Sequence, residues 1–203
     1  MSGDLKERLL QQLDGMPRGL AAHVQRARKE IGELARRFGV DEETANLAAL
    51  AHDVARHIEG ERLIALAAGF GIPVLPIERA VPVLLHGPVG AEILARELGV
   101  QESELLEATR IHTSGKGGMS LLSKVVFLGD KLDPTKEGMY PFIARVRELA
   151  KRDLDAALLA FLNANIMQLL QQGHPIHPYM LEARNELLMT KGHSQHGQEQ
   201  SCS

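Results

Sequence analysis

The sequence predicts an all-α protein, and three observations support this fold class. Apolar residues make up 44% of the 203 residues, but aromatic residues only 3%, and tryptophan is absent. A core of leucine, alanine, valine and isoleucine favours packed helices over aromatic-rich strands. Apolar residues recur at helical spacing in one segment after another, and neither an internal repeat nor a strand–helix alternation is visible. We therefore expect a helical bundle.

Capping residues, glycine and proline mark the ends of the expected helices. In the first part of the chain we expect helices over 4–14, interrupted by Gly15 and Pro17; over 20–38, closed by Gly39; over 41–60, opened by Asp41 with Thr44; and over 61–70; then a short helix or turn over 77–85. In the second part we expect helices over 89–98, closed by Gly99; over 102–111; over 120–131, capped by Ser120; over 142–170, as one long amphipathic element; and over 180–189.

The length suits one domain, or one domain with an appendage. We expect a helical N-terminal extension over 1–19 and the main domain over 20–190. Residues 191–203 are polar and aperiodic, so we expect a disordered tail there.

Composition also limits the partners and the compartment. The formal net charge of -3 gives no strong electrostatic reason to expect nucleic acid or an anionic membrane as a partner. The single cysteine, Cys202, cannot form an internal disulfide, which fits a reducing cytoplasm. The first residues lack a secretory apolar core, and we expect no apolar stretch of the roughly 18 residues that a membrane helix needs. We therefore expect a soluble, cytoplasmic protein.

The adjacent pair His52-Asp53, inside an apolar helical run, is the most informative feature of the chain. Neighbouring side chains on a helix point about 100 degrees apart, so the pair cannot complete a metal site alone. Other helices would supply the remaining ligands. With the pair, the candidates provide six nitrogen and oxygen ligands: His23, His52, Asp53, His86, His112 and Asp130.

This ligand set predicts metal-dependent chemistry on phosphate esters. Six ligands without a thiolate are too many for one tetrahedral zinc, and they suit iron, manganese or another octahedral ion. A pair of such ions bridged by Asp53 is one arrangement that this ligand set allows. Two metals about 3.5 to 4 Å apart can activate a hydroxide and bind the oxygens of a phosphoryl group during in-line displacement.

Several of these residues also have ordinary structural explanations. His86 could cap the helix that follows it, and the helix dipole favours a histidine such as His112 at a helix end. Arg56 is either a phosphate contact or a solvated helix charge. Asp130 is different, because an unpaired carboxylate in an apolar helix is costly, so metal ligation explains it better.

The glycine-rich segment 113–120 follows His112 directly. Its backbone amides could approach an anion, and it could receive a phosphate or a base of the substrate. It does not match a P-loop, because Lys116 is not followed by serine or threonine and no strand precedes the segment. We expect His174 and His177, which flank prolines, to have structural roles.

The order of the six ligands resembles the HD-domain metal-dependent phosphohydrolase superfamily, in its dinuclear branches. Segments 84–91, 112–115, 119–125 and 129–134 look like the YqeK-type proteins, which are symmetrical diadenosine tetraphosphate hydrolases. The likeness covers roughly residues 20–188.

This resemblance implies an all-helical HD fold, a dinuclear centre of iron, with manganese or cobalt as alternatives, and cleavage of diadenosine tetraphosphate into two ADP. It implies that His23, His52, Asp53 and Asp130 hold one metal, that Asp53 bridges to a second metal held by His86 and His112, and that a metal-bound hydroxide attacks a β-phosphorus. Asp53 and Arg56 would be catalytic. The expected substrate contacts are Arg26, Arg56, Gly87, Thr113, Ser114 and Gly115. The resemblance also suggests a homodimer.

This chain departs from the family at a few positions. Family members often have lysine at the position of Arg56, glutamate at that of Asp133 and arginine at that of Lys136, and segment 140–143 replaces a usual Pro-Gly turn. Three other interpretations remain open: an HD phosphohydrolase of another nucleotide, such as a nucleoside mono- or polyphosphate or an alarmone; a non-catalytic nucleotide sensor; and a purely structural helical protein.

Overall fold

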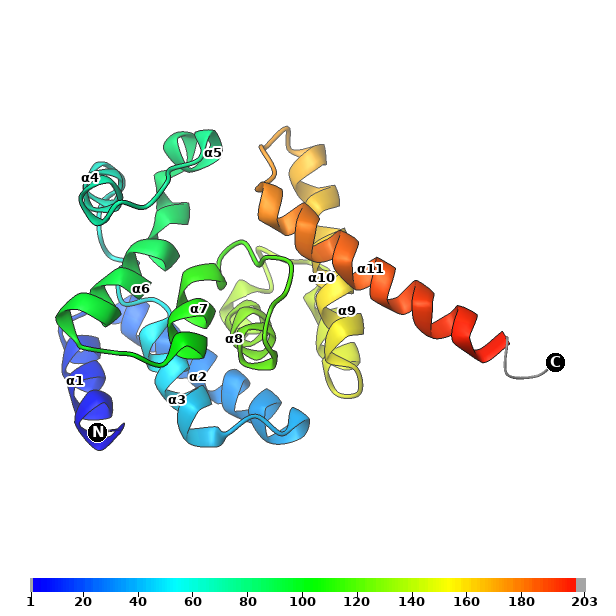
Figure 1. Ribbon diagram of the computed structural model, residues 1–203, viewed down its shortest axis with the longest axis horizontal. Helices are drawn as coiled ribbons and strands as arrows, with labels where there is room; N and C mark the ends of the chain where they lie inside the picture. The colour runs from blue at the N-terminus through cyan, green and yellow to red at the C-terminus, as the bar shows by residue number, and fades with distance from the viewer. Residues whose placement is uncertain (1, 200–203) are drawn as a thin grey trace.

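The computed structural model describes the backbone of residues 2–199, and all regular structure in that range is helical, as predicted. Figure 1 shows the arrangement. The elements are α1 (Ser2–Asp14), α2 (Arg18–Phe38), α3 (Glu42–Ala51), α4 (Gly60–Phe70), α5 (Pro76–Ala80), the 3-10 turn η1 (Pro82–Leu85), α6 (His86–Glu97), α7 (Ser103–Ile111), α8 (Leu121–Lys131), the 3-10 turn η2 (Pro134–Lys136), α9 (Ile143–Ala150), α10 (Leu154–Gln171) and α11 (Pro178–Glu199).

The core is built around α8, which packs against α2, α3, α7 and α10. Phe127 of α8 and Phe161 of α10 are both fully buried and meet edge to face, with their ring centroids 5.6 Å apart. Where α8 meets α2, a Cβ on Gly129 would lie 3.0 Å from the backbone of Ile31, so only glycine allows this close approach. The close crossing brings the residues on either side of it, including Asp130, next to α2.

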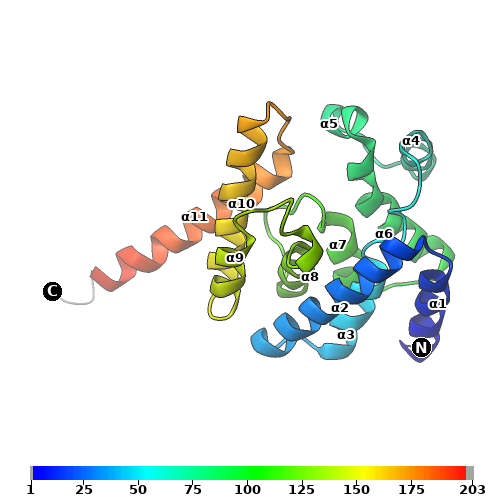
Figure 2. The ribbon, with the colours of Figure 1, turned by 180° about the vertical axis from the view of Figure 1, so that it is seen from behind.

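The N-terminal helix α1 shares this core. Leu5, Leu9 and Leu13 are buried, and α1 packs against α3. The domain boundary expected at residue 19 remains a prediction. Seen from both sides, α1 and the far end of α11 lie at opposite ends of the molecule (Figures 1 and 2).

The helix expected over 41–60 is shorter than predicted: α3 ends at Ala51, just before the His52-Asp53 pair. From there the chain makes tight turns, in which the amides of Val54 and Arg56 donate to the carbonyls three residues earlier, at 3.1 and 2.9 Å. Leaving the α-helix allows two neighbouring side chains to point inward together, which the spacing of a regular helix prevents.

The long helix expected over 142–170 is two helices, α9 and α10. The carboxylate of Asp153 accepts a hydrogen bond from the amide of Ala156 at 2.8 Å and so begins α10. An aspartate that caps a helix competes with the backbone bonds that would continue the preceding one. The predicted single element was therefore wrong at this position.

Among the other helix boundaries, two differ most from the prediction. Helix α6 begins at His86 instead of residue 89, since Pro88 sits in the first turn, where its missing N–H is not needed. Helix α11 continues to Glu199, through most of the expected disordered tail; its residues contain no proline after Pro178, so the local backbone bonds are not interrupted. Residues 200–203 of that tail lie outside the described residues.

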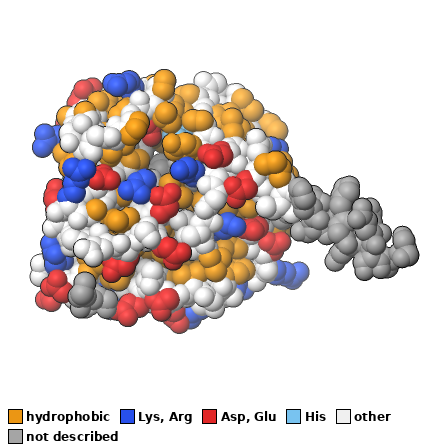
Figure 3. Space-filling view, in the orientation of Figure 1, with side chains coloured by type: hydrophobic (Ala, Val, Ile, Leu, Met, Phe, Trp, Pro, Cys, Tyr) orange, Lys and Arg blue, Asp and Glu red, His pale blue; other side chains and the backbone are white. Residues whose placement is uncertain are grey.

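One helix differs from the expectation about membrane spans. Helix α10, with 18 residues, is long and apolar enough to cross a membrane by length and composition. This is weak evidence, because one side of α10 packs in the core through residues such as Leu158 and Leu162. On the face shown in Figure 3, basic and acidic side chains are interspersed without a large area of one sign.

Candidate metal centre

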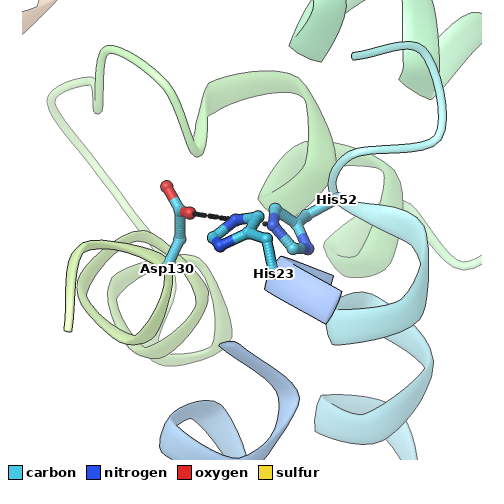
Figure 4. A group of neighbouring side chains, drawn as sticks. All are labelled: His23, His52 and Asp130. Atoms are coloured by element: carbon cyan, nitrogen blue, oxygen red, sulfur yellow. Dashed lines mark ion pairs between the residues drawn. The ribbon is translucent and has the colours of Figure 1, made fainter. Parts of the chain in front are cut away.

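The six predicted ligands converge at one place in the bundle. His23 comes from α2, His52 and Asp53 from the turn after α3, His86 from the start of α6, His112 from the end of α7 and Asp130 from α8. Figure 4 shows His23, His52 and Asp130 pointing toward one another from three different elements, with His23 Nε2 2.9 Å from Asp130 Oδ1. Helix packing therefore assembles a cluster that no single segment could form.

Asp53 lies at the centre of the cluster, and its two oxygens face different histidines. Oδ2 is 3.5 Å from Nε2 of His23 and 3.6 Å from Nε2 of His52. Oδ1 is 3.2 Å from Nε2 of His86 and 3.4 Å from Nε2 of His112. The carboxylate therefore stands between two histidine pairs, as a bridging ligand would.

All four imidazoles are held by their Nδ1 atoms. The Nδ1 of His52 donates to the carbonyl of Ala49 at 2.7 Å. Nδ1 of His86 donates to Val83 at 2.5 Å, and Nδ1 of His112 to Thr109 at 2.7 Å. For His23 the partner is the carboxylate of Asp133, at 2.6 Å. Such bonds orient the rings of metal-binding histidines and leave Nε2 as the ligand atom.

The surroundings of three Nε2 atoms, those of His52, His86 and His112, test whether the cluster fits a metal. Nε2 of His52 is buried without a hydrogen-bond partner. Nε2 of His86 and of His112 lie 3.0 Å apart, and because both rings donate through Nδ1, two lone pairs face each other. A metal–nitrogen bond is about 2.1 Å long, so a single cation can bind both nitrogens when they are this close together. Such a cation would replace the repulsion between the two lone pairs with two bonds. The donor set therefore fits a metal.

A cavity of about 550 Å³ opens onto the cluster, and we call it the metal cavity. It is lined by ligand side chains and by Arg56, Thr113, Lys136, Met139 and Tyr140. The ligands thus face a space large enough for a bound small molecule.

Comparison with known proteins agrees with this geometry. The HD domain family matches residues 20–135, which is more than half of the chain. This protein belongs to the HD-domain family. HD-domain proteins bind divalent metals, and the histidine and aspartate groups of this chain could hold one.

Two relatives of this HD-domain protein carry the name symmetrical bis(5'-nucleosyl)-tetraphosphatase. One, from Bacillus subtilis, is 38% identical over 72% of this chain and 77% of its own length. The other, from Halalkalibacterium halodurans, is 35% identical over 77% of this chain and 82% of its own length. Among solved structures, a predicted HD superfamily hydrolase involved in NAD metabolism, from Clostridium acetobutylicum, matches with a TM-score of 0.84 and 26% identity, covering 94% of this chain and 98% of that chain.

The surroundings of His52, His112 and Asp53 favour the protonation states that bind metal. Burial lowers the pKa of His52, and it lowers that of His112 to about 4, so both are neutral at pH 7. Burial opposes ionisation of Asp53, but the imidazoles of His52, His112 and His86 outweigh it and hold the pKa of Asp53 well below its usual value. Neutral imidazoles beside an ionised carboxylate are the forms that coordinate a cation.

Asp130 has partners that the sequence did not indicate. Nζ of Lys131 donates to Asp130 Oδ2 at 2.7 Å and to the backbone carbonyl of His112 at 2.9 Å. Lys136 Nζ lies 2.5 Å from Asp130 Oδ1. Burial raises the pKa of Asp130, but the positive charges of Lys131 and Lys136 lower it by more, so that the pKa lies well below its usual value. The expectation that this carboxylate would be unpaired without a metal was wrong, because lysines on both sides of it fold inward.

The expected substrate contacts fall into two groups. Arg56 and Thr113 line the metal cavity, and Arg56 is exposed there. The remaining four have other surroundings. Arg26 donates to Asp133 at 2.8 Å. A Cβ on Gly87 would lie 2.7 Å from the carbonyl oxygen of Arg110, so this glycine packs α6 against α7. For all six residues, substrate binding remains a prediction, and the geometry favours Arg56 and Thr113.

The glycine-rich segment is used by the fold itself. The amide of Gly115 donates to Ile111 at 2.7 Å, and the amide of Gly118 donates to the carboxylate of Glu186 at 2.6 Å. Ser114 is buried, and its hydroxyl donates to the carbonyl of Gly115 at 2.9 Å. These amides already have acceptors, so the expected approach of an anion to them has no support here.

Proposed function

We propose that this protein is a hydrolase that cleaves diadenosine tetraphosphate symmetrically into two ADP. The names of the two relatives, at 38% and 35% identity, support this substrate and reaction. The observation that carries the proposal is the position of Asp53, whose two oxygens face separate histidine pairs. A bridging carboxylate between two ligand sets is suited to a dinuclear centre for phosphoryl transfer.

In this proposal the two metals share Asp53 and are otherwise held by different ligands. His23, His52, Asp53 and Asp130 would hold one ion, while Asp53, His86 and His112 would hold the other. We propose iron, with manganese or cobalt as alternatives, because imidazole and carboxylate ligands without a thiolate suit these ions. When bound, the metals supply an activated water and positive charge for the phosphoryl oxygens.

Cationic side chains at the metal cavity would position the phosphate chain. Arg56 is exposed at the cavity, where its guanidinium can form paired hydrogen bonds with phosphate oxygens. Lys136 also lines the cavity and already contacts Asp130, so its ammonium lies beside both the ligand set and the substrate space. Thr113 Oγ1, 3.5 Å from His86 Nε2, provides a hydroxyl at the same wall.

The remaining expectations belong to the same proposal. We expect the substrate to be a dinucleoside polyphosphate, the compartment to be the cytoplasm and the assembly to be a homodimer, with neither nucleic acid nor membrane as a partner. Gel filtration with light scattering would decide the assembly, and a mass equal to one chain would contradict the dimer.

A chromatographic product assay tests the proposed reaction. Protein loaded with iron, manganese or cobalt should convert diadenosine tetraphosphate into ADP as the only nucleotide product, and Asp53→Ala should abolish turnover. AMP together with ATP would contradict symmetrical cleavage. An intact dinucleotide alongside cleavage of a mononucleotide or an alarmone would favour another HD phosphohydrolase, and tight binding without turnover would favour a nucleotide sensor.

A further inference from the structure

We propose that a second cavity, next to the metal cavity, binds one of the two nucleosides of the dinucleotide, an inference that rests on the proposed function. This second cavity has a volume of about 320 Å³. It lies between the α4–α5 segment, the facing sides of α6 and α7, and the beginning of α11. Its size is at the lower end of the range for small-molecule pockets, about 300–1,000 Å³, which suits a nucleoside.

The two cavities share their dividing walls. Ile111 and Ser114 line the second cavity, whereas His112 and Thr113, between them in the chain, line the metal cavity. At the other wall, Leu84 faces the second cavity and Val83 the metal cavity. Neighbouring residues of the same two segments therefore line the two spaces, so the cavities lie side by side. A molecule bound at the metals therefore has the second cavity as its immediate neighbour.

The lining of the second cavity suits a base better than a phosphate chain. Ile72, Leu75 and Leu84 provide apolar surface, and Tyr179 provides an aromatic ring. Its charged lining residues are three carboxylates, of Glu78, Glu92 and Glu107, and two cations, of Arg110 and Lys116. A cavity with more acids than bases disfavours phosphates, which would remain on the metal side with Arg56 and Lys136.

Polar groups for a base or ribose are present in the second cavity. Arg110 donates to Glu107 at 3.0 Å and lies 3.4 Å from Glu92, so this cluster offers both acceptors and donors. Nζ of Lys116 lies 5.5 Å from the centre of the Tyr179 ring. Within the described part of the chain Lys116 has no ion-pair partner, so its ammonium can donate to a bound nucleoside.

The position of Tyr179 is set by a buried contact. Its amide donates to Nδ1 of His177 at 3.2 Å, and Nε2 of His177 lies 3.5 Å from Oε1 of Glu78. Glu78 is itself buried and accepts from the amide of Leu75 at 2.7 Å. The contact between His177 and Glu78 joins the start of α11 to α5 across the cavity. The Tyr179 ring is therefore already in position before a ligand binds, and fewer side chains lose freedom on binding. This also gives His177 the structural role expected from the sequence.

Symmetrical cleavage explains why two nucleoside sites are needed. The bond that breaks lies at the middle of the substrate, so a nucleoside extends from the metals on each side. Leu20, Met139 and Tyr140 line the metal cavity and would contact one nucleoside. The second cavity would contact the other.

A comparison of two substrates tests the inference. Diadenosine tetraphosphate has two nucleosides, and adenosine 5'-tetraphosphate has one. The measured quantity is the ratio of kcat/KM for the first to kcat/KM for the second. Tyr179→Ala should lower this ratio about five- to hundredfold, the usual effect of removing an aromatic ring that stacks on a base. Tyr179→Phe keeps the ring and should retain the ratio.

A second variant, Lys116→Ala, tests the inference independently in case Tyr179→Ala does not fold. Lys116→Ala should lower the same ratio and leave the melting temperature of the protein unchanged. An unchanged ratio in both Tyr179→Ala and Lys116→Ala, with both variants folded by circular dichroism, would overturn the second site. Equal losses for the two substrates would overturn it as well, because the effect would then not depend on the second nucleoside.

Failure of the proposed function would be recognised separately. If the wild-type protein cleaves neither substrate, the proposed hydrolysis fails. Calorimetric titration with adenosine then tests whether the second cavity binds a nucleoside. Adenosine binding that is lost in Tyr179→Ala and kept in Asp53→Ala would support a nucleoside site. Absence of binding to the wild-type protein would overturn it.

Discussion

His23 Nδ1 lies 2.6 Å from Asp133 Oδ2, and this bond directs Nε2 of the same ring at Asp53 and Asp130. Asp133 also accepts from Arg26 at 2.8 Å and from the amide of Thr135 at 2.9 Å. The carboxylate is therefore fixed from several sides, and it holds a ring that belongs to a different helix. Partners of this kind keep a ligand in its binding orientation.

We expect Asp133→Ala to weaken metal binding about 10- to 100-fold, because His23 loses its orienting partner. The measurement is a calorimetric titration of metal-free protein with manganese. Asp155→Ala removes a carboxylate that pairs with Lys124 and does not line the metal cavity, so it should bind metal normally. Equal affinities for the wild-type protein and Asp133→Ala would show that the bond does not matter.

We expect Lys136→Ala to lower kcat/KM for diadenosine tetraphosphate about 100-fold, the typical effect of removing one donor that stabilises developing negative charge. Lys136→Arg keeps a cation at the cavity and should recover most of the loss. Steady-state rates with saturating metal provide the test. The matched control is Lys124→Ala, whose ammonium binds Asp155 at 2.7 Å outside the cavity. Loss of activity in Lys136→Arg as large as in Lys136→Ala would contradict a purely electrostatic role.

The free energy of unfolding of the metal-free protein should decrease as the pH is lowered below about 6.5. Burial lowers the pKa of His112 to about 4, so between these values the unfolded chain binds a proton that the folded protein does not. The resulting loss in free energy of unfolding is about 3 kcal/mol by pH 4. His52, with its pKa also lowered, acts in the same direction.

His23 acts in the opposite direction. Burial lowers its pKa, but Asp130 and Asp133 raise it, and the net effect is a raised value. Its contribution is present at low pH and is lost as pH rises through the folded pKa. The effects of His52 and His112 on stability are therefore opposed by that of His23 alone. Urea unfolding from pH 4 to 7 should show that the free energy of unfolding increases with pH. A flat or falling profile would refute this sign.

Gly87→Ala should destabilise the protein by about 1 to 3 kcal/mol, because the new Cβ would lie 2.7 Å from the backbone oxygen of Arg110. Backbone atoms cannot move aside as a flexible side chain can. Gly69→Ala in α4 is the control, since a Cβ there meets nothing within 4 Å. It should leave stability unchanged or raise it by up to about 1 kcal/mol. Thermal unfolding of both variants compares them, and equal melting temperatures would rule out the close packing of α6 on α7.

The fold class was predicted correctly from the sequence, and the candidate metal ligands could be named from it, because both depend on local signals. Helical spacing of apolar residues is repeated along the whole chain, and a histidine–aspartate pair inside an apolar run is conspicuous wherever it occurs. Asp41, Gly39 and Ser120 mark helix ends through interactions with residues only a few positions away. Family resemblance added the pairing of the ligands.

Features that depend on distant residues could not be predicted in this way. Nothing near Asp130 in sequence showed that Lys131 would turn inward to the carbonyl of His112, or that Glu186 would occupy the amide of Gly118. The end of α3 before His52 was missed because burial of two neighbouring side chains outweighed helix propensity. The sequence by itself thus determined which side chains can coordinate a metal and which segments are helical. Only the tertiary structure decided which groups face one another, because burial and charge pairing are set by helices that meet far apart in the chain.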